Sequence, residues 1–273
     1  MSARHVATLP CTLYGTAWKE ARTEALTAQA LELGYRAIDT ANQRKHYVEA
    51  DVGRAVKKSG IARAELFLQS KFTYVRGQDQ RLPYDPSAPI GQQVRQSLHS
   101  SLEHLGSDHL DAYLLHGPWG QGWSGYDREA WAALETLLDE GRVRSIGVSN
   151  VSLAQLRSLC AQERLAPAFV QNRCYARRGW DRALRAFCAE RGIVYQGFSL
   201  LTANAAELAA PEVEAAAQRR GVSVAQLVFA FARGVGMLPL TGTTSRTHMR
   251  DDLASEQLTL TAAELALLER LGD

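Results

Sequence analysis

The feature that most constrains this chain is a regular alternation of short apolar runs with longer amphipathic stretches. The apolar runs have the length and the β-branched or aromatic content of strands, and eight of them can be identified. The predicted strands are Cys11–Ala17, Tyr35–Ala41, Leu66–Lys71, Leu110–His116, Val143–Asn150, Ala168–Asn172, Ile193–Ser199 and Met237–Thr241.

Stretches with helical periodicity separate these runs. Residues that often cap helix N-termini support several of them, namely Ser152, Asp181, Ser223 and Thr261. A repeated strand–helix order predicts a parallel sheet covered by helices. The predicted helices are Arg22–Leu33, Val48–Ser59, Ile90–Leu105, Trp131–Glu140, Leu153–Glu163, Asp181–Arg191 and Val224–Arg233.

The chain length selects between two arrangements of such a sheet. Eight β/α units that close into a barrel need about 250 residues, and the chain has 273. A doubly wound nucleotide-binding fold should carry G-x-G-x-x-G after an early strand, and neither that motif nor a phosphate-binding P-loop is found. We therefore predict an α/β fold, a single (β/α)₈ TIM barrel, with residues 1–273 forming one domain.

Composition narrows the functional class. The formal net charge is only +2 and no segment is a basic run, so neither nucleic acid nor a membrane is an expected partner. No apolar span reaches ~18 residues, and the first residues lack the apolar stretch of a signal peptide, so a cytoplasmic location is expected. The four cysteines have no metal-ligand spacing, which predicts free thiols and no metal site.

Polar residues stand where several predicted strands end. Asp39, Lys71 and His116 each close a strand, and Tyr47 lies in the loop after Asp39. The carboxyl ends of barrel strands meet at one mouth, so these four side chains are expected to converge. Each has an alternative role taken alone: a helix cap for Asp39, a solvated charge for Lys71 and a backbone contact for His116.

These residue types together suit the protonation of a carbonyl oxygen as hydride reaches the carbon. A phenol has a pKa of about 10, too high for an efficient acid near neutrality, and a neighbouring ammonium lowers it. Lys71 can supply that ammonium, and Asp39 can balance its buried charge. His116 can hydrogen-bond the substrate oxygen or relay a proton.

Four segments resemble the aldo-keto reductase family, and the likeness spans nearly the whole chain. GYRAIDTA, LFLQSKF and LDAYLLHGP are similar to the family segments that carry the catalytic aspartate, lysine and histidine, which places these roles on Asp39, Lys71 and His116. GRVRSIGVSN is similar to the most recognisable family stretch. The resemblance implies an NAD(P)H-dependent oxidoreductase that reduces an aldehyde or ketone to the alcohol, or works in the alcohol dehydrogenase direction.

The tyrosine position departs from the family pattern. Tyr47 stands eight positions after Asp39, in a loop that is longer than usual, and His46 falls nearer the tyrosine position in some gapped alignments. We assign the general acid to Tyr47 because the chemistry needs a phenol near a lysine and the loop holds no other tyrosine.

The resemblance also implies a nicotinamide dinucleotide lying across the barrel mouth, NADPH in the first place and NADH as the alternative. Phe198 matches the aromatic residue that stacks on the nicotinamide, where tyrosine is usual. Arg173 stands where relatives often carry glutamate. The positions that match cofactor contacts are Thr16, Ala17, Ser149, Asn150, Gln171, Phe198, Ser199, Leu201, Thr202, Gly242, Thr243, Thr244 and His248.

The adenosine end departs most from the family. Gly242 stands where a lysine is expected and His248 about where an arginine is expected. The segment Gly242–Thr244 can still hold a phosphate through backbone amides and hydroxyls, with Arg246 or Arg250 supplying charge. The alternative is a plain glycine turn that opens a helix.

Aromatic residues are expected to enclose the carbonyl substrate. Trp18, Tyr74 and Trp119 are the predicted pocket residues, and the long loops Phe72–Pro89 and Gly117–Tyr126 are predicted to form its walls. Trp18 could instead be a core residue, and the loops could be exposed decoration. A monomer is expected, with a small oligomer as the alternative.

A second function from a different class remains open at this point. A barrel that binds the dinucleotide can act as a regulatory or interaction subunit with little catalysis, and the four predicted catalytic residues argue against it.

Overall fold

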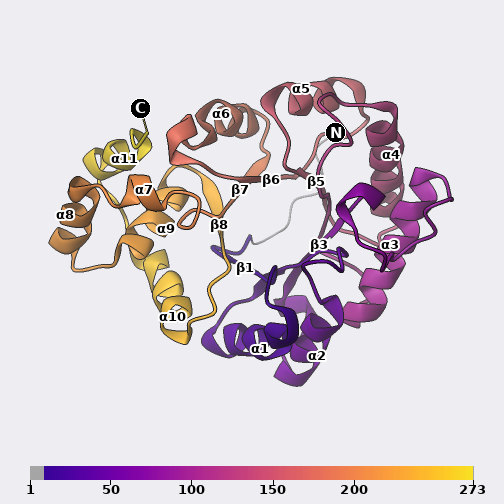
Figure 1. Ribbon diagram of the computed structural model, residues 1–273, viewed down its shortest axis with the longest axis horizontal. Helices are drawn as coiled ribbons and strands as arrows, with labels where there is room; N and C mark the ends of the chain where they lie inside the picture. The colour runs from indigo at the N-terminus through magenta and orange to yellow at the C-terminus, as the bar shows by residue number, and fades with distance from the viewer. Residues whose placement is uncertain (1–8, 273) are drawn as a thin grey trace.

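The computed structural model describes residues 9–272, which form a closed barrel of eight parallel strands in chain order (Figure 1). Every strand falls within or beside its predicted segment, so the predicted TIM barrel is confirmed. Residues 1–8 and 273, which the one-domain and signal-peptide predictions also cover, lie outside the described residues. The strands are β1 (Leu13–Gly15), β2 (Ala37–Asp39), β3 (Phe67–Phe72), β4 (Ala112–Leu115), β5 (Ile146–Ser149), β6 (Phe169–Arg173), β7 (Val194–Phe198) and β8 (Met237–Thr241).

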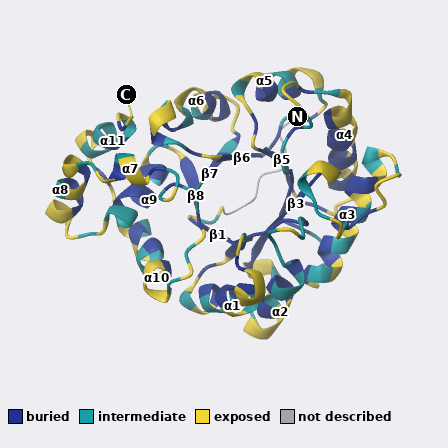
Figure 2. Cartoon of the chain, in the orientation of Figure 1, coloured by how far each residue is buried: buried dark blue, intermediate teal, exposed yellow. Residues whose placement is uncertain are grey.

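Helices surround the barrel and bury their inner faces against it (Figures 1 and 2). All seven predicted helices are present, although α4 begins at Gly125 rather than Trp131, because Ser124 caps it. Four helices lie outside the seven predicted ranges, namely α7, α8, α10 and α11, of which α11 was anticipated only by the cap at Thr261. The helices are α1 (Thr23–Leu33), α2 (Glu49–Ser59), α3 (Ile90–Leu105), α4 (Gly125–Asp139), α5 (Leu153–Gln162), α6 (Arg182–Glu190), α7 (Ala205–Leu208), α8 (Pro211–Arg220), α9 (Val224–Gly234), α10 (Arg246–Ala254) and α11 (Ala262–Glu269).

Three of the four predicted helix caps are confirmed. Ser152, Ser223 and Thr261 each accept a hydrogen bond from the backbone N–H three residues later, and each belongs to a reciprocal capping box. The prediction for Asp181 is wrong. Its backbone is left-handed, with φ of 54°, and its carboxylate instead accepts a hydrogen bond of 2.8 Å from the hydroxyl of Tyr195.

The two-residue alternation of the strands sorts side chains between the barrel interior and the helices. An apolar layer fills the interior, and Gly147 belongs to this tight region because a Cβ there would lie 2.6 Å from the carbonyl oxygen of Phe169. Above the apolar layer, toward the carboxyl ends of the strands, the inward positions turn polar. The apolar layer comprises Leu13, Ala37, Phe67, Ala112, Leu114, Phe169 and Leu238.

Within the part of the chain that the structure describes, no helix combines the length and the apolar character needed to cross a bilayer.

Candidate active site

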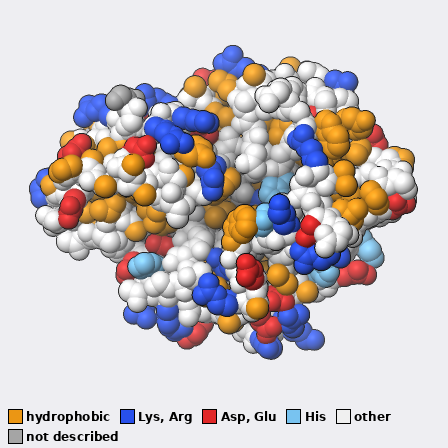
Figure 3. Space-filling view, viewed as in Figure 1, with side chains coloured by type: hydrophobic (Ala, Val, Ile, Leu, Met, Phe, Trp, Pro, Cys, Tyr) orange, Lys and Arg blue, Asp and Glu red, His pale blue; other side chains and the backbone are white. Residues whose placement is uncertain are grey.

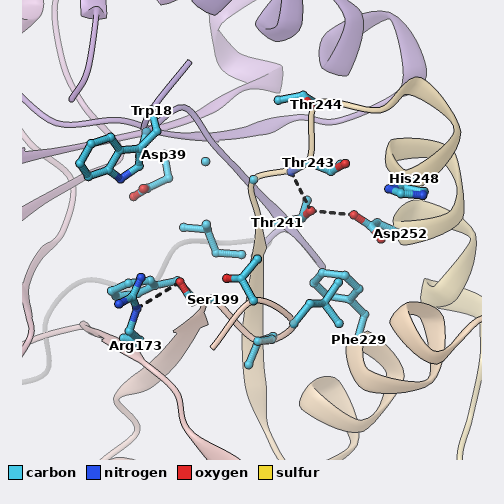
Figure 4. A pocket seen from close by; sticks show the side chains of 18 of the residues that line it. Trp18, Asp39, Arg173, Ser199, Phe229, Thr241, Thr243, Thr244, His248 and Asp252 are labelled. Carbon is cyan, nitrogen blue, oxygen red and sulfur yellow. Dashed lines mark hydrogen bonds between the residues drawn. The ribbon is translucent and has the colours of Figure 1, made fainter. Parts of the chain in front are cut away.

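A cavity of about 670 Å³ opens at the carboxyl ends of the strands. It is the hollow in the middle of the face shown in Figure 3, and Figure 4 shows it from close by. Most of the predicted site residues lie on its walls. Those that line it are Ala17, Trp18, Asp39, Tyr47, His116, Ser149, Asn150, Gln171, Phe198, Ser199, Leu201, Thr202, Gly242, Thr243, Thr244 and His248.

Asp39 and Lys71 form a buried ion pair at the floor of the cavity. The Lys71 Nζ lies 2.7 Å from both carboxylate oxygens of Asp39 and 2.9 Å from the carbonyl oxygen of Thr40, so its three N–H groups are all used. The side chain of Lys71 is only 1% exposed. Burial lowers the pKa of Lys71, and the Asp39 carboxylate opposes that lowering.

Three glutamines extend this pair into a polar layer inside the barrel. Gln69 donates to Asp39 Oδ1 at 2.6 Å and Gln171 donates to the same oxygen at 3.0 Å. Gln196 accepts from both amides, at 2.8 and 2.9 Å. Sequence reasoning missed Gln69 and Gln196, although their place on inward strand positions was the available signal. The layer fixes the orientation of the Asp39 carboxylate.

Tyr47 reaches the cavity from the loop between β2 and α2. Its ring centroid lies 5.6 Å from Lys71 Nζ and 6.0 Å from the ring of His116, which it meets edge to face. Among residues 9–272 its hydroxyl has no hydrogen-bond partner. The structure does not show the predicted lowering of the Tyr47 pKa by Lys71. Burial raises the pKa of Tyr47, and the negative charge of Asp39 raises it further.

His46, the other candidate for the tyrosine position, does not line the cavity. Its ring stacks on Trp18 at a centroid separation of 3.4 Å, and its backbone carbonyl oxygen accepts a hydrogen bond of 2.8 Å from the backbone N–H of Trp18. Trp18 itself is 67% exposed at the rim, so it is a pocket residue and not a core residue. The geometry thus brings Tyr47 rather than His46 to the floor of the cavity.

His116 is held by a residue that sequence reasoning missed. The hydroxyl of Thr73 lies 2.6 Å from His116 Nδ1, and it has no other hydrogen-bond partner among the described residues. Burial, helped by the positive charge of Lys71, lowers the pKa of His116 to about 3. The imidazole is therefore neutral near pH 7. In the tautomer in which Nδ1 accepts from Thr73, the ring proton lies on Nε2.

Several predicted cofactor residues bond to each other at the cavity wall. Ser149 Oγ donates to the carbonyl oxygen of Gln171 at 2.7 Å, and Asn150 Nδ2 donates to that of His116 at 2.8 Å. Thr16 is an exception among the predicted contacts. It is fully buried beneath the cavity, where its hydroxyl donates to the carbonyl oxygen of Asp39 at 3.0 Å, so it does not line the wall.

Tyr74, Trp119 and the two long loops were predicted to form the pocket wall, but none of their residues lines this cavity. Tyr74 is buried and its hydroxyl donates to Asp127 Oδ1 at 3.1 Å, while Trp119 packs edge-on against Tyr74 at 5.1 Å. These aromatic rings face the helices because an apolar cluster around Phe72 lies on that side of the loops.

The Phe72–Pro89 loop instead packs on the loop that carries Tyr47. Gln78 Nε2 donates to the carbonyl oxygen of Asn42 at 2.7 Å, and Gln43 Nε2 donates to that of Gly77 at 2.8 Å. Tyr84 anchors the brace with a 2.7 Å bond from its hydroxyl to the carbonyl oxygen of Thr73. The brace therefore connects the backbone beside Tyr47 with the residue that holds His116.

At the far end of the cavity, Gly242 is exposed and its neighbours Thr243 and Thr244 line the wall near His248 (Figure 4). The two arginines that were candidates for phosphate binding do not line the cavity. Arg246 is engaged on the outer surface, where its guanidinium forms bonds of 2.9 and 2.7 Å with Glu32. Lys19, which sequence reasoning missed, lines the cavity at this end.

Within residues 9–272, no group of three or more His, Cys, Asp or Glu side chains is placed to hold a metal ion, and all four cysteines are free thiols. Two of them, Cys174 and Cys188, are buried, whereas Cys11 is exposed and Cys160 partly so.

A sequence model described as the Aldo/keto reductase family matches residues 12–273. An aldo-keto reductase from Mycolicibacterium vanbaalenii is 33% identical over 255 residues, covering 93% of this chain and 85% of its own length. Glyoxal reductase from Bacillus subtilis is 35% identical over 209 residues, covering 76% of this chain and 67% of its own length.

Solved structures agree with this result. The crystal structure of an aldo/keto reductase from Brucella melitensis superposes with a TM-score of 0.82 at 28% identity, covering 96% of this chain and 95% of its own. Members of the family reduce or form small carbonyl compounds with a nicotinamide dinucleotide. The chain therefore belongs to the aldo/keto reductase family and is an NAD(P)H-dependent oxidoreductase.

Proposed function

We propose that this protein reduces a small aldehyde or ketone to the alcohol with NADPH, and that Tyr47 donates the proton to the carbonyl oxygen. The observation that carries the proposal is the meeting of Tyr47 and His116 in one cavity, edge to face at 6.0 Å, above the Asp39–Lys71 pair. A phenol and a neutral imidazole on one wall can both donate a hydrogen bond to a single carbonyl oxygen.

The roles of the four residues follow from their contacts. The hydroxyl of Tyr47 has no hydrogen-bond partner within residues 9–272 and carries the transferable proton. Thr73 turns the Nε2–H of His116 toward the cavity, where it orients the substrate oxygen. Lys71 lies 5.6 Å from the phenol ring, where its attraction for the phenolate left after proton transfer is opposed by the charge of Asp39, and Asp39 holds this lysine in place.

The residues on the wall fit a nicotinamide dinucleotide. Bound NADPH would supply the hydride. Phe198 offers an aromatic face beside Ser199, and the amides of Asn150 and Gln171 lie on the same wall for a carboxamide. Ser199 has a left-handed backbone, with φ of 56°, a strained conformation that is concentrated at ligand sites. A cavity of about 670 Å³ is within the usual size of a small-molecule site.

A steady-state assay tests the proposal. Purified protein is incubated with NADPH and with small aldehydes, glyoxal among them because a relative is named for it, and NADPH absorbance is followed. We expect turnover that depends on both reactants. Tight NADPH binding without oxidation by any aldehyde or ketone would instead favour a cofactor-binding regulatory or interaction subunit.

A further inference from the structure

Lys19 is a buried cation at the wall of the cavity, in the loop after β1. It is 3% exposed, and its Nζ donates to the carbonyl oxygen of Gly242 at 2.7 Å. The residues on both sides of it, Trp18 and Glu20, have left-handed backbones with φ of 60° and 49°. Such strain in non-glycine residues persists where a side chain must be aimed for function.

The charge of Lys19 has no counter-ion among the described residues. Its neighbours are the face of the Tyr14 ring, 5.2 Å away, and Arg22, which carries the same sign. Burial and Arg22 lower the pKa of Lys19 to about 8, so the ammonium form still predominates near pH 7. A buried charge normally has a partner, as Lys71 has in Asp39. Lys19 lacks one and borders a cavity, which indicates an anionic ligand.

The position of Lys19 bears on a departure noted in the sequence. The family resemblance implies a lysine at position 242, where this chain has glycine, and a Cβ built at Gly242 would lie 3.9 Å from Lys19 Nζ. The ammonium of Lys19 therefore lies beside the place from which the missing lysine would extend. Thr243, Thr244 and the first turn of α10 border the same part of the cavity with hydroxyl and N–H donors.

We propose that Lys19, from the loop after β1, binds the 2′-phosphate of NADPH and thereby replaces the lysine that is absent at position 242. The inference rests on the proposed use of NADPH, and it names the residue that selects NADPH over NADH.

Two carboxylates at this end of the cavity favour the opposite preference, for NADH. Asp251 and Asp252 also line this end, and a carboxylate that accepts from a ribose 2′-hydroxyl favours NADH. Asp252 is already engaged, since Thr241 donates to it at 2.6 Å (Figure 4). Asp251 remains as the carboxylate that would favour NADH, and our assignment to NADPH rests on the buried charge of Lys19.

Equilibrium binding, followed by protein fluorescence, tests the proposal without turnover. The ligands are NADPH and NADH, together with 2′,5′-ADP and 5′-AMP, which lack the nicotinamide. We expect wild type to bind NADPH at least tenfold more tightly than NADH. Lys19→Gln and Lys19→Met should reduce this ratio at least tenfold by weakening NADPH alone, and 2′,5′-ADP should lose affinity in the same proportion.

A rescue and a matched control sharpen the result. Gly242→Lys in the Lys19→Gln background should restore the preference, because the backbone at Gly242 has an ordinary φ and room for a side chain. The control is Arg173→Gln, which removes the cation that contacts Ser199 Oγ at 3.3 Å, away from Gly242. It should leave the NADPH-to-NADH ratio unchanged.

Three results would overturn the proposal. One is a wild type without preference for NADPH. Another is equal weakening of NADPH and NADH by the Lys19 variants, which would place the ammonium on the pyrophosphate. The third is failure of both variants to fold, judged by thermal melting, which would make Lys19 structural. An enzyme that turns over no aldehyde but shows the expected ratios would refute only the proposed reaction.

Discussion

The two ends of the cavity are built in different ways. At the catalytic end the charged groups are fully paired: Lys71 uses all three N–H groups, and Asp39 accepts from Lys71, Gln69 and Gln171. At the opposite end, around Gly242, where we propose that the adenosine binds, Lys19 has one carbonyl partner and no counter-ion among the described residues, and Gly242 has no side chain. The buried charges beside Tyr47 stand on the ends of β2 and β3, whereas Lys19 and Gly242 stand in loops, where a residue of another element can take over a contact.

The largest expected effect is at the catalytic end. Tyr47→Phe should lower kcat for carbonyl reduction by about 10³-fold, because general acid catalysis contributes factors of about 10² to 10⁴. NADPH affinity should stay within twofold, because the ring remains. Single-turnover kinetics and fluorescence titration measure the two quantities. Tyr126→Phe, at an exposed tyrosine that does not line the cavity, is the matched control. Retained turnover in Tyr47→Phe would remove this residue as the acid.

Lys71→Met should lower both activity and stability. Loss of the lysine leaves Asp39 buried without its counter-charge, which costs about 3–5 kcal/mol, and we expect kcat to fall by about 10²-fold. Urea unfolding and steady-state kinetics provide the measurements. The double variant Asp39→Asn, Lys71→Met removes both charges, so it should recover stability but not activity. If Lys71→Met has the same free energy of unfolding as wild type, the Asp39 charge does not depend on its pairing with Lys71, and the contrast between the two ends of the cavity fails.

Much of this end could be predicted from the sequence, for a physical reason. The alternation within strands and the polar residues at their ends are local patterns. They therefore identified all eight strands and predicted that Asp39, Lys71 and His116 would meet at one mouth of the barrel. Contacts between strands are not local. The bond from Thr73 to His116 and the bond from Lys19 to Gly242 depend on angles between elements, which no spacing in the sequence records.

The residues that the structure places elsewhere than expected differ for the same reason. An aromatic residue in a loop can face the cavity or the helices, and nothing near Tyr74 or Trp119 in the sequence chooses between them. Their side was decided by the apolar cluster around Phe72 and by Asp127, a residue from another element. Likewise, Asp181 has the side chain of a helix cap, but its bond to Tyr195 uses the carboxylate elsewhere.

A smaller effect is expected at Thr73, which acts through His116. Thr73→Val keeps the shape and removes the hydroxyl, so the imidazole loses its fixed orientation and kcat should fall about tenfold with little change in KM. Because the pKa of His116 is lowered to about 3, the ring is neutral above that value. Wild-type kcat should therefore show no loss between pH 8 and pH 5 from its protonation.

The comparison for Thr73 is a buried threonine elsewhere. Thr27 on α1 is buried and its hydroxyl has no hydrogen-bond partner within the described residues, so Thr27→Val should leave kcat and its pH profile unchanged. Equal behaviour of the two variants would assign Thr73 to the fold rather than to the orientation of His116.

The smallest effect is expected for Arg246→Ala at the adenosine end. Its guanidinium is bound to Glu32 on the exposed surface, where solvent screens the pair, so NADPH affinity should change less than twofold and the urea midpoint of unfolding should stay close to that of wild type. Fluorescence titration beside Lys19→Gln separates the two cations. A tenfold loss for Arg246→Ala would show that the phosphate is held from outside the cavity and would reverse the assignment.

The brace between the Phe72–Pro89 loop and the Tyr47 loop has a consequence for how this enzyme can diversify. The reactive phenol is positioned by contacts between two surface segments, through Gln78, Gln43 and Tyr84, while its partners stand on the barrel itself. Insertions or exchanges in the long loop would shift the acid relative to a rigid lysine and histidine. Under the proposed mechanism, reaction rate and carbonyl preference would then change together in descendants of this gene.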